Sequence, residues 1–302
     1  MKKQAVARLL VRELQARVAL DRSFGAEFQR IPLPEPLDLT HALDPEGEED
    51  RPSPEPVRAR TEPMPRPASQ GRVPFGPLSA KRETPAAPEF RRAAGLDLPP
   101  FEEAIPPDER EAALLPVREA ALACTLCPLS ETRTRVVFGE GSLTADLVFV
   151  GEAPGRDEDL QGRPFVGRAG ELLTAMIERG MKRPRGSVYI CNILKCRPPQ
   201  NRDPQPGEVR ACTPYLCRQL ETIRPRLIVA LGRIAAQLLS GEPLSMKRLR
   251  GRFLSYRGIP LLPVYHPAYL LRVRGHAGAK TEEDRQTWED LQKAMAFLST
   301  PG

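Results

Sequence analysis

Short apolar runs alternate with amphipathic stretches along the second half of the chain. The runs at 147–150, 188–194 and 227–231 contain mostly branched and aromatic residues, as the buried strands of a parallel sheet do. Residues 252–265 predict a hairpin that turns at Arg257-Gly258. Helical periodicity is found at 109–123, 167–179, 205–224, 233–239 and 282–298. This alternation predicts an α/β fold of three layers, α/β/α, with a short central parallel sheet.

The first third of the chain has a different pattern. Apolar residues recur there every four positions, at Val6, Leu10, Leu14 and Val18. This spacing predicts an amphipathic helix within residues 1–30. From Pro32 to Pro107 there are 18 prolines among 76 residues. A stretch of this composition cannot bury enough apolar surface to offset the conformational entropy of the chain. We therefore expect a disordered Pro-rich linker at 31–107 and a folded domain at 108–302.

The net charge of +6 is unevenly distributed. Residues 1–111 hold 17 Lys/Arg and 20 Asp/Glu, a net of −3, whereas residues 112–302 hold 28 and 19, a net of +9. The basic part is therefore the candidate for binding a polyanion. Charged residues interrupt the apolar run that a secretory signal would need, and no run approaches the roughly 20 apolar residues of a membrane span. We expect a cytoplasmic protein without membrane contact.

The six cysteines of the chain favour metal or cluster ligation over disulfides. Cys124 and Cys127 form a C-x-x-C pair, and Cys196 and Cys212 flank a Pro-rich loop of 15 residues. A lone C-x-x-C is typical of a redox pair or of chance, but the second pair favours a site with four thiolates. The chemistry of such a site allows either Zn²⁺ or an iron–sulfur cluster.

Three predicted strands end in polar residues that can carry chemistry. The first strand stops at Gly151 and leads into a predicted loop with Pro154-Gly155. This loop carries four carboxylates, Glu152, Asp157, Glu158 and Asp159. Asn192 lies near the end of the next strand, and His266 directly follows the last one. Because ligands of open α/β sheets bind outside the carboxyl ends of the strands, these residues predict a binding site; a solvated acidic loop is the simpler alternative.

Four motifs follow one another along the folded part. They are Gly-Glu-Ala-Pro-Gly-Arg-Asp-Glu-Asp at 151–159, Gly-Arg-Pro-Phe-Val-Gly at 162–167, Asn192 before Lys-Cys-Arg-Pro-Pro at 195–199, and His-Pro-Ala-Tyr-Leu-Leu at 266–271. In this order they resemble the family 4 uracil-DNA glycosylases, the iron–sulfur class. The resemblance runs from about residue 112 to residue 299. Residues 1–111 lie outside it, and the partner of this extension is unknown.

The resemblance implies a DNA repair enzyme that hydrolyses the N-glycosidic bond of deoxyuridine, releases uracil and leaves an abasic site. Uracil must leave the base stack and enter a pocket, where Phe165 would stack on it. Asn192 would donate to uracil O4 and accept from N3–H, a pattern that cytosine reverses. Uracil departs as an anion, and His266 would donate a hydrogen bond near its O2, as a neutral imidazole can.

Several groups could position the attacking water. Some other uracil glycosylases place an Asp where this chain has Ala153, which lies beside the substrate but cannot hold a water. The carboxylates that could do so are, in order of preference, Glu158, Glu152 and Asp157. Backbone groups could equally hold the water while DNA phosphates stabilise a cationic sugar.

The helix after His266 would supply a wedge that fills the vacated stack. The wedge residues would be Tyr269, Leu270, Leu271 and Arg272. The alternative is that these residues form an ordinary helix core.

The resemblance also implies a [4Fe–4S] cluster on Cys124, Cys127, Cys196 and Cys212. Hydrolysis needs no redox step, so the cluster would be structural, tying the segment near residue 124 to the loop 197–211. That loop would present Arg197, Arg202 and Arg210 to phosphates. The expected partner is uracil-containing DNA, single- or double-stranded, bound by a nucleoid-associated monomer.

Two other classes of protein are compatible with these residues. One is a uracil-DNA-binding protein without turnover, and the other is a zinc-stabilised DNA-binding adaptor. Relatives that trap uracil DNA covalently carry a basic, His-containing insertion between the Asn motif and the last cluster cysteine. The short loop 197–211 holds no His, which argues against trapping.

A chain that begins near residue 108 should keep its fold and its activity on short oligonucleotides. The reason is that the Pro-rich stretch has no periodic apolar face to contribute to a core. Thermal unfolding of the shortened and the full chain measures this. Loss of cooperative unfolding on truncation would show that the predicted helix at 5–22 belongs to the domain.

Overall fold

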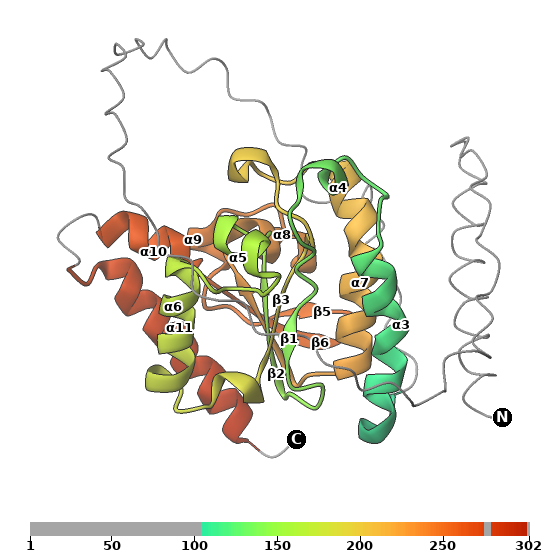
Figure 1. The fold of residues 1–302 in the computed structure, drawn as a ribbon. Coiled ribbons are helices and arrows are strands. Elements are labelled where there is room, and N and C mark those ends of the chain that lie inside the picture. Colours follow the sequence, from blue (N-terminus) through green and yellow to red (C-terminus); the bar gives the residue numbers. More distant parts are fainter. Residues whose placement is uncertain (1–103, 275–278, 301–302) are drawn as a thin grey trace, which may run out of the picture. The chain divides into compact units, whose positions relative to one another are not determined.

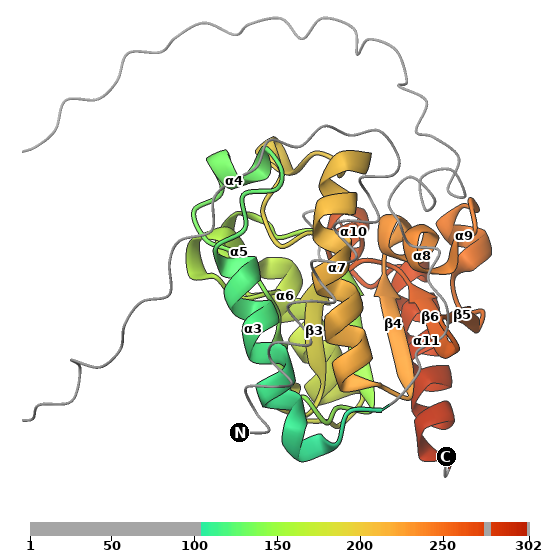
Figure 2. The same cartoon turned by 90° about the vertical axis from the view of Figure 1, so that its right-hand side faces the viewer.

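The computed structural model describes residues 104–274 and 279–300. These residues lie within one compact unit of the chain, Glu83–Gly302. Figures 1 and 2 show a central sheet with helices packed on both sides, in agreement with the predicted three-layer α/β/α fold. The predicted N-terminal helix and nearly all of the predicted Pro-rich linker lie outside the described residues.

A six-stranded sheet with the order β1-β3-β2-β4-β6-β5 forms the middle layer. Its strands are β1 (Glu140–Gly141), β2 (Leu147–Gly151), β3 (Tyr189–Asn192), β4 (Leu227–Leu231), β5 (Leu254–Tyr256) and β6 (Ile259–Val264). β3, β2, β4 and β6 are parallel neighbours, as predicted. Both edges are antiparallel, since β1 pairs with β3 and β5 with β6. The β5–β6 pair is the predicted hairpin, whereas the short edge strand β1 was not predicted.

The predicted helices are confirmed with small shifts at their ends. They are α3 (Arg110–Leu122), α6 (Arg168–Ala175, continued by a π-helical turn at Met176–Gly180), α7 (Pro206–Ile223), α8 (Arg233–Ser240) and α11 (Glu282–Ser299). Shorter helices complete the set: α4 (Leu129–Thr132), α5 (Arg156–Gln161), α9 (Met246–Leu249) and α10 (Pro267–Arg274). None of the helices found in 104–274 and 279–300 is long and apolar enough to cross a membrane.

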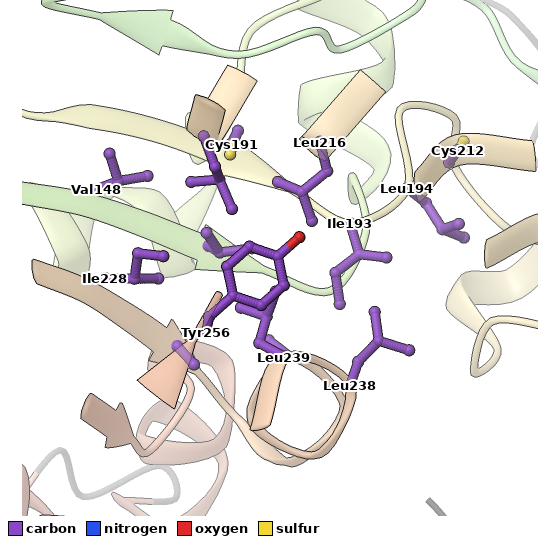
Figure 3. Close-up of a cluster of buried hydrophobic side chains, with 14 of the residues drawn as sticks. Val148, Cys191, Ile193, Leu194, Cys212, Leu216, Ile228, Leu238, Leu239 and Tyr256 are labelled. Carbon is purple, nitrogen blue, oxygen red and sulfur yellow. The ribbon is translucent and has the colours of Figure 1, made fainter. Parts of the chain in front are cut away.

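Each strand of the parallel region is buried on both faces. Val148 and Val150 pack into one core together with apolar residues of α7 and α8, and Figure 3 shows the ring of Tyr256 among them. Leu147 and Phe149 face the other way, into a core with α6 and α11. This is why the strands read as continuous apolar runs rather than as alternating ones.

The acidic segment after β2 differs from the prediction of a loop. α5 begins immediately after Gly155, so Asp157, Glu158 and Asp159 lie in its first turn. Carboxylates are favourable there because the N-terminus of a helix is positively polarised. The Glu158 carboxylate also accepts from the backbone N–H of Gly155, at 3.1 Å, which satisfies one of the N–H groups that a helix start leaves unpaired.

A buried ion pair fixes α11 to the loop after α9. Arg250 donates from Nε and Nη2 to the two carboxylate oxygens of Asp290, at 2.8 and 2.6 Å, and from Nη2 to the carbonyl of Gln286 at 2.7 Å. Asp290 is fully buried. Its pKa is raised by burial, and Arg250 opposes this shift. The guanidinium also lies 6.0 Å from the ring centre of Tyr265, which precedes His266.

Replacing Arg250 by Met should lower the free energy of unfolding by about 3–5 kcal/mol, because the buried Asp290 loses its two hydrogen bonds from Arg250 and Lys293, 3.7 Å away, is a weaker partner. Chemical denaturation measures the change. The double variant Arg250→Met/Asp290→Leu should recover part of the loss, since it removes the unpaired carboxylate. Arg285→Met is the matched control, because the ion pairs of Arg285 with Glu282 and Glu289 are exposed and should not matter. An Arg250→Met protein as stable as this control would contradict a stabilising role.

Candidate active site

The carboxyl ends of the parallel strands bring the predicted site residues to one edge of the sheet. Gly151 at the end of β2 lies opposite Asn192 at the end of β3. On the other side, the N–H of Gly232, just after β4, donates to the carbonyl of Val264 at 2.9 Å, two residues before His266. The register thus places Asn192, Gly151 and His266 along the same edge, as predicted.

Asn192 presents a buried amide that the chain leaves unpaired. The residue is 1% exposed, and neither Nδ2 nor Oδ1 of its side chain has a hydrogen-bond partner within 104–274 and 279–300. Leaving a buried donor and acceptor unsatisfied costs about 1–3 kcal/mol, so such groups are rare in folded proteins. An amide kept in this state is suited to a ligand that offers one acceptor and one donor side by side.

Gly151 allows the ring of Phe165 to approach this amide. A Cβ atom at position 151 would lie 2.3 Å from Oδ1 of Asn192 and 2.6 Å from Cζ of Phe165. Phe165 itself has a φ of +52° and is 6% exposed. Its left-handed turn needs Gly170, where a Cβ would lie 1.9 Å from the carbonyl oxygen of Phe165. The Asn192 amide and the Phe165 ring can therefore lie side by side only because position 151 is a glycine.

His266 is held as a neutral hydrogen-bond donor. Its Nδ1 accepts from the backbone N–H of Ala268 at 3.1 Å, so the ring proton of the neutral imidazole is on Nε2. Burial lowers the pKa of His266 to about 4, and the nearby Arg272 adds to the shift. The ring centres of His266 and Phe165 are 5.6 Å apart. Nε2–H is thus available to an acceptor at neutral pH.

Glu158 has a different role from the predicted one. One oxygen of its buried carboxylate accepts from the N–H of Gly155, and the other accepts from the N–H groups of Val166 and Gly167, both at 3.0 Å. These bonds tie α5 to the segment that carries Phe165. A carboxylate that accepts from three backbone donors has less acceptor capacity left for a water, which makes Glu158 a weaker candidate for that role than its first place in the prediction. This role could not be read from the local sequence, because two of the three donors, Val166 and Gly167, are eight and nine residues away from Glu158.

Glu152 is the carboxylate whose electrostatics suit catalysis. The pKa of Glu152 is raised to about 7, chiefly by burial and also by Asp203, and Arg233 and Arg272 oppose the shift. Asp157 is exposed, with Oδ2 only 2.6 Å from where a Cβ of Gly167 would lie. Ala153 is partly buried and packs against the core on the α7 side. Of the three carboxylates, Glu152 is the one whose pKa is raised into the neutral range.

The wedge predicted after His266 lies on α10, and one of its members is wrong. Leu270 is fully buried, because the helix turns Pro267 and Leu270 to the same inner face. Arg272 is exposed, with its guanidinium 5.9 Å from the ring centre of Tyr269. Leu271 and Tyr269 are partly exposed. A surface wedge can therefore include these three residues but not Leu270.

The four predicted cluster cysteines come together from three parts of the chain. Cys124 and Cys127 lie in the turn after α3, Cys196 follows β3, and Cys212 lies on α7. Burial raises the pKa of Cys196, Arg133 lowers it through a contact of Nη1 with Sγ at 3.3 Å, and Cys127 and Cys124 raise it. Burial also raises the pKa of Cys212 to about 12, and Cys196 and Cys127 contribute. The four thiols are thus close enough to influence one another.

Four thiolates that lie close together are the ligand type that both zinc and iron–sulfur clusters use, so the residues fit such a group. Among residues 104–274 and 279–300, no three His, Cys, Asp or Glu side chains are close enough to hold one metal ion. Cys217 lies elsewhere, with Sγ 3.3 Å from the hydroxyl of Tyr256.

The loop between the cysteines uses part of its charge internally. Arg202 pairs with Glu208 on α7 through both of its terminal nitrogens, rather than pointing outward as predicted. Arg197 donates from Nε to Oδ1 of Asn201 at 2.8 Å. Arg210 is exposed on α7. The ion pair with Glu208 explains why Arg202 is a poor candidate for a phosphate contact.

Comparison with known proteins adds an independent result. The family described as the uracil DNA glycosylase superfamily matches residues 138–292. A type-4 uracil-DNA glycosylase of Thermotoga maritima is 46% identical over 196 residues, which cover 64% of this chain and 98% of the relative. One of Archaeoglobus fulgidus is 49% identical over 164 residues, 51% of this chain and 81% of the relative. A type-5 uracil-DNA glycosylase of Pyrobaculum aerophilum is 32% identical over 148 residues, which cover 43% of this chain and 64% of the relative.

His266 should stay neutral down to about pH 4 in the folded protein, which ¹⁵N NMR of the imidazole can follow. In the unfolded chain it should titrate near its ordinary pKa of about 6.5. The unfolded state therefore binds more protons between these values, so stability should fall as the pH drops from about 6.5 to 4. His266→Gln should remove part of this fall. A His266 imidazolium signal in the folded protein at pH 6 would contradict the assignment.

Proposed function

The chain belongs to the type-4 branch of the uracil-DNA glycosylase superfamily, and from this we propose that it hydrolyses the N-glycosidic bond of deoxyuridine in DNA. The products are free uracil and an abasic site. The observation that carries the proposal is the buried, unpaired amide of Asn192 beside the ring of Phe165. That pair offers the hydrogen-bonding edge and the stacking face that a flipped uracil requires.

Asn192 selects the base. Its Nδ2 donates to O4 of uracil, and its Oδ1 accepts from N3–H. Cytosine presents the opposite pattern, an amine donor and a bare N3, so both groups of the amide would stay unpaired against it. Because unpaired buried polar groups are costly, this edge discriminates more strongly than shape alone. Phe165 holds the ring of the base from one face.

His266 stabilises the leaving group. The bond to the sugar breaks with its electron pair on uracil, and negative charge develops at O2 of the base. Nε2–H of a neutral His266 donates to that oxygen as the charge appears. Because the Nδ1 bond to Ala268 fixes the ring, the donor is already oriented before the reaction begins.

Glu152 positions the water that attacks the sugar. As a carboxylate it accepts a hydrogen bond from the water and can take up its proton when the new C–O bond forms. A pKa of about 7 suits that role near neutral pH. Asp157 is the second candidate for holding the water. Whichever carboxylate holds it, phosphates of the DNA can stabilise the cationic sugar.

The α10 surface and its surroundings bind the DNA. Tyr269, Leu271 and Arg272 fill the space that the flipped base leaves in the stack, and the basic charge of the domain attracts the phosphates. Substrates are single- or double-stranded DNA containing uracil. A monomeric state and a cytoplasmic location at the nucleoid stay predictions.

The cysteines Cys124, Cys127, Cys196 and Cys212 hold a [4Fe–4S] cluster. The group supplies a cross-link rather than a redox step, because hydrolysis transfers no electrons. It joins the turn after α3 to the loop and helix that follow β3. The convergence of the four thiols supports one site that all four share, and the sequence resemblance to the iron–sulfur class favours a cluster over zinc.

Incubation of the full chain with oligonucleotides that contain one uracil, scored for abasic sites, tests the function. Excision of uracil with no action on matched cytosine oligonucleotides is the expected result. Asn192→Asp should abolish most uracil excision, because a carboxylate acceptor would face O4. Binding of uracil DNA without any abasic product would instead favour the non-enzymatic alternative. An Asn192→Asp protein with full activity would place the base-reading residue elsewhere.

The single-turnover excision rate should rise with pH through about 7 if the ionised Glu152 holds the water. Glu152→Gln should lose this step and lower the rate by about 100-fold or more. Asp157→Asn tests the second candidate, and it should keep the pH step because Asp157 is exposed. The same step in Glu152→Gln would show that another group titrates.

Replacing Cys212 by Ala should remove both the brown colour and most of the soluble yield, because metal binding is coupled to folding at such sites. Visible absorbance and iron analysis measure the effect. Cys217→Ala is the matched control on the same helix and should keep the colour. A folded, coloured Cys212→Ala protein would reject this ligand, and colourless wild-type protein with bound zinc would reject the cluster.

A further inference from the structure

Lys195, three residues after Asn192, has a buried amino group that donates two hydrogen bonds. It is 1% exposed, and its Nζ donates to the backbone carbonyl of Asn192 at 2.7 Å and to Oε1 of Gln219 at 2.6 Å. Its third side faces the ring of Phe138, with 5.9 Å between Nζ and the ring centre. Burying an ammonium group costs several kcal/mol unless its donors are satisfied, so a Lys at this place needs a reason.

The partners of Lys195 connect it to the helix that carries a cluster cysteine. Gln219 lies on α7, two turns after Cys212, and its Nε2 donates to the carbonyl of Phe138 at 2.8 Å and to the hydroxyl of Tyr189 at 3.0 Å. Because both ends of its amide are used, Gln219 is fixed. Lys195 is therefore anchored to α7 at one end and to Asn192 at the other.

The contact with Asn192 acts on the base-reading side chain through the backbone. The carbonyl that Lys195 binds belongs to the residue whose amide is left unpaired. The next two backbone N–H groups, of Ile193 and Leu194, donate to Gly151 and Glu152, each at 3.0 Å. The peptide planes on the C-terminal side of Asn192 are thus held in place. An amide without partners of its own depends on such fixed backbone for its direction.

We propose that Lys195 is a positioning residue that aims the Asn192 amide at uracil and links the base-reading site to the cysteine-bearing helix α7. The inference rests on the proposed role of Asn192 in reading uracil. Lys195 does not touch the substrate in this scheme. It acts through the carbonyl of Asn192, and Gln219 transmits the position of α7 to it.

A double-mutant cycle in the full chain tests the proposal. Lys195→Met keeps the length of the side chain and removes its donors. It should lower the single-turnover excision rate by about 10- to 100-fold, as small misplacements of a catalytic array do. On an Asn192→Ala background the same change should cost nothing further, because the residue through which Lys195 acts is gone. Lys293→Met is the matched control, since Lys293 is half-exposed and contacts Gly251 and Asp290 rather than Asn192 or Gln219; its melting temperature corrects for the lost ion pair with Asp290.

A second readout does not depend on activity. The side-chain ¹⁵N amide signal of Asn192, identified by its loss in Asn192→Ala, should shift or broaden in Lys195→Met and stay in place in Lys293→Met. Melting temperature and visible absorbance show whether the variants keep their fold and colour. If Lys195→Met is insoluble, Gln219→Leu removes the partner of Lys195 on α7 instead. It should also lower the excision rate only when Asn192 is present, by a smaller factor than Lys195→Met.

Equal losses from Lys195→Met with and without Asn192 would overturn the proposal, because they would assign Lys195 to general stability. An unchanged Asn192 amide signal would do the same. Wild-type protein that fails to excise uracil would reject the proposed function, and the amide signal would still decide whether Lys195 orients Asn192.

Discussion

The close approach at Gly151 is the constraint on which the site depends. Parallel pairing of β2 with β3 puts this residue opposite Asn192, and the ring of Phe165 closes over the same backbone. The glycine is required here for space rather than for an unusual φ, since any Cβ would lie 2.3 Å from the amide oxygen of Asn192. Amide and ring can meet only because the strand between them ends without a side chain. The left-handed turn at Phe165, made possible by Gly170, is the second half of the same arrangement.

Buried polar groups around this point fall into two kinds. Glu158 and Lys195 are buried but satisfied, the first by backbone N–H groups and the second by a carbonyl and an amide oxygen. Asn192 is buried and unsatisfied. The satisfied groups fix the two segments that carry Phe165 and Asn192, and the free-energy cost of an unpaired group is concentrated where a ligand can relieve it. This division distinguishes a prepared binding edge from a packing defect.

Elements defined by local pattern were predictable, whereas features that depend on distant partners were not. The parallel strands followed from continuous apolar runs, and Asn192 and His266 from their places at strand ends. α5 was missed because Pro154-Gly155 favours a turn, although the acidic residues that follow suit a helix start. The capping role of Glu158 and the burial of Leu270 depend on what packs around them. Lys195 was not singled out, because Gln219, its side-chain partner, is 24 residues away.

One physical cause sets the charge of the reacting groups. Burial is the main cause that lowers the pKa of His266 to about 4 and raises that of Glu152 to about 7. The same exclusion of water therefore keeps the His266 imidazole neutral and makes the Glu152 carboxylate easier to protonate. Arg272 lowers both values, which favours neutral His266 and ionised Glu152. In the proposed mechanism, the neutral His266 then faces uracil and the ionised Glu152 faces the sugar. This is the polarity that bond breaking needs, because uracil becomes negative and the sugar positive. Oriented groups in a water-poor site stabilise this charge separation without moving. In bulk water, solvent molecules would first have to reorient to give the same stabilisation.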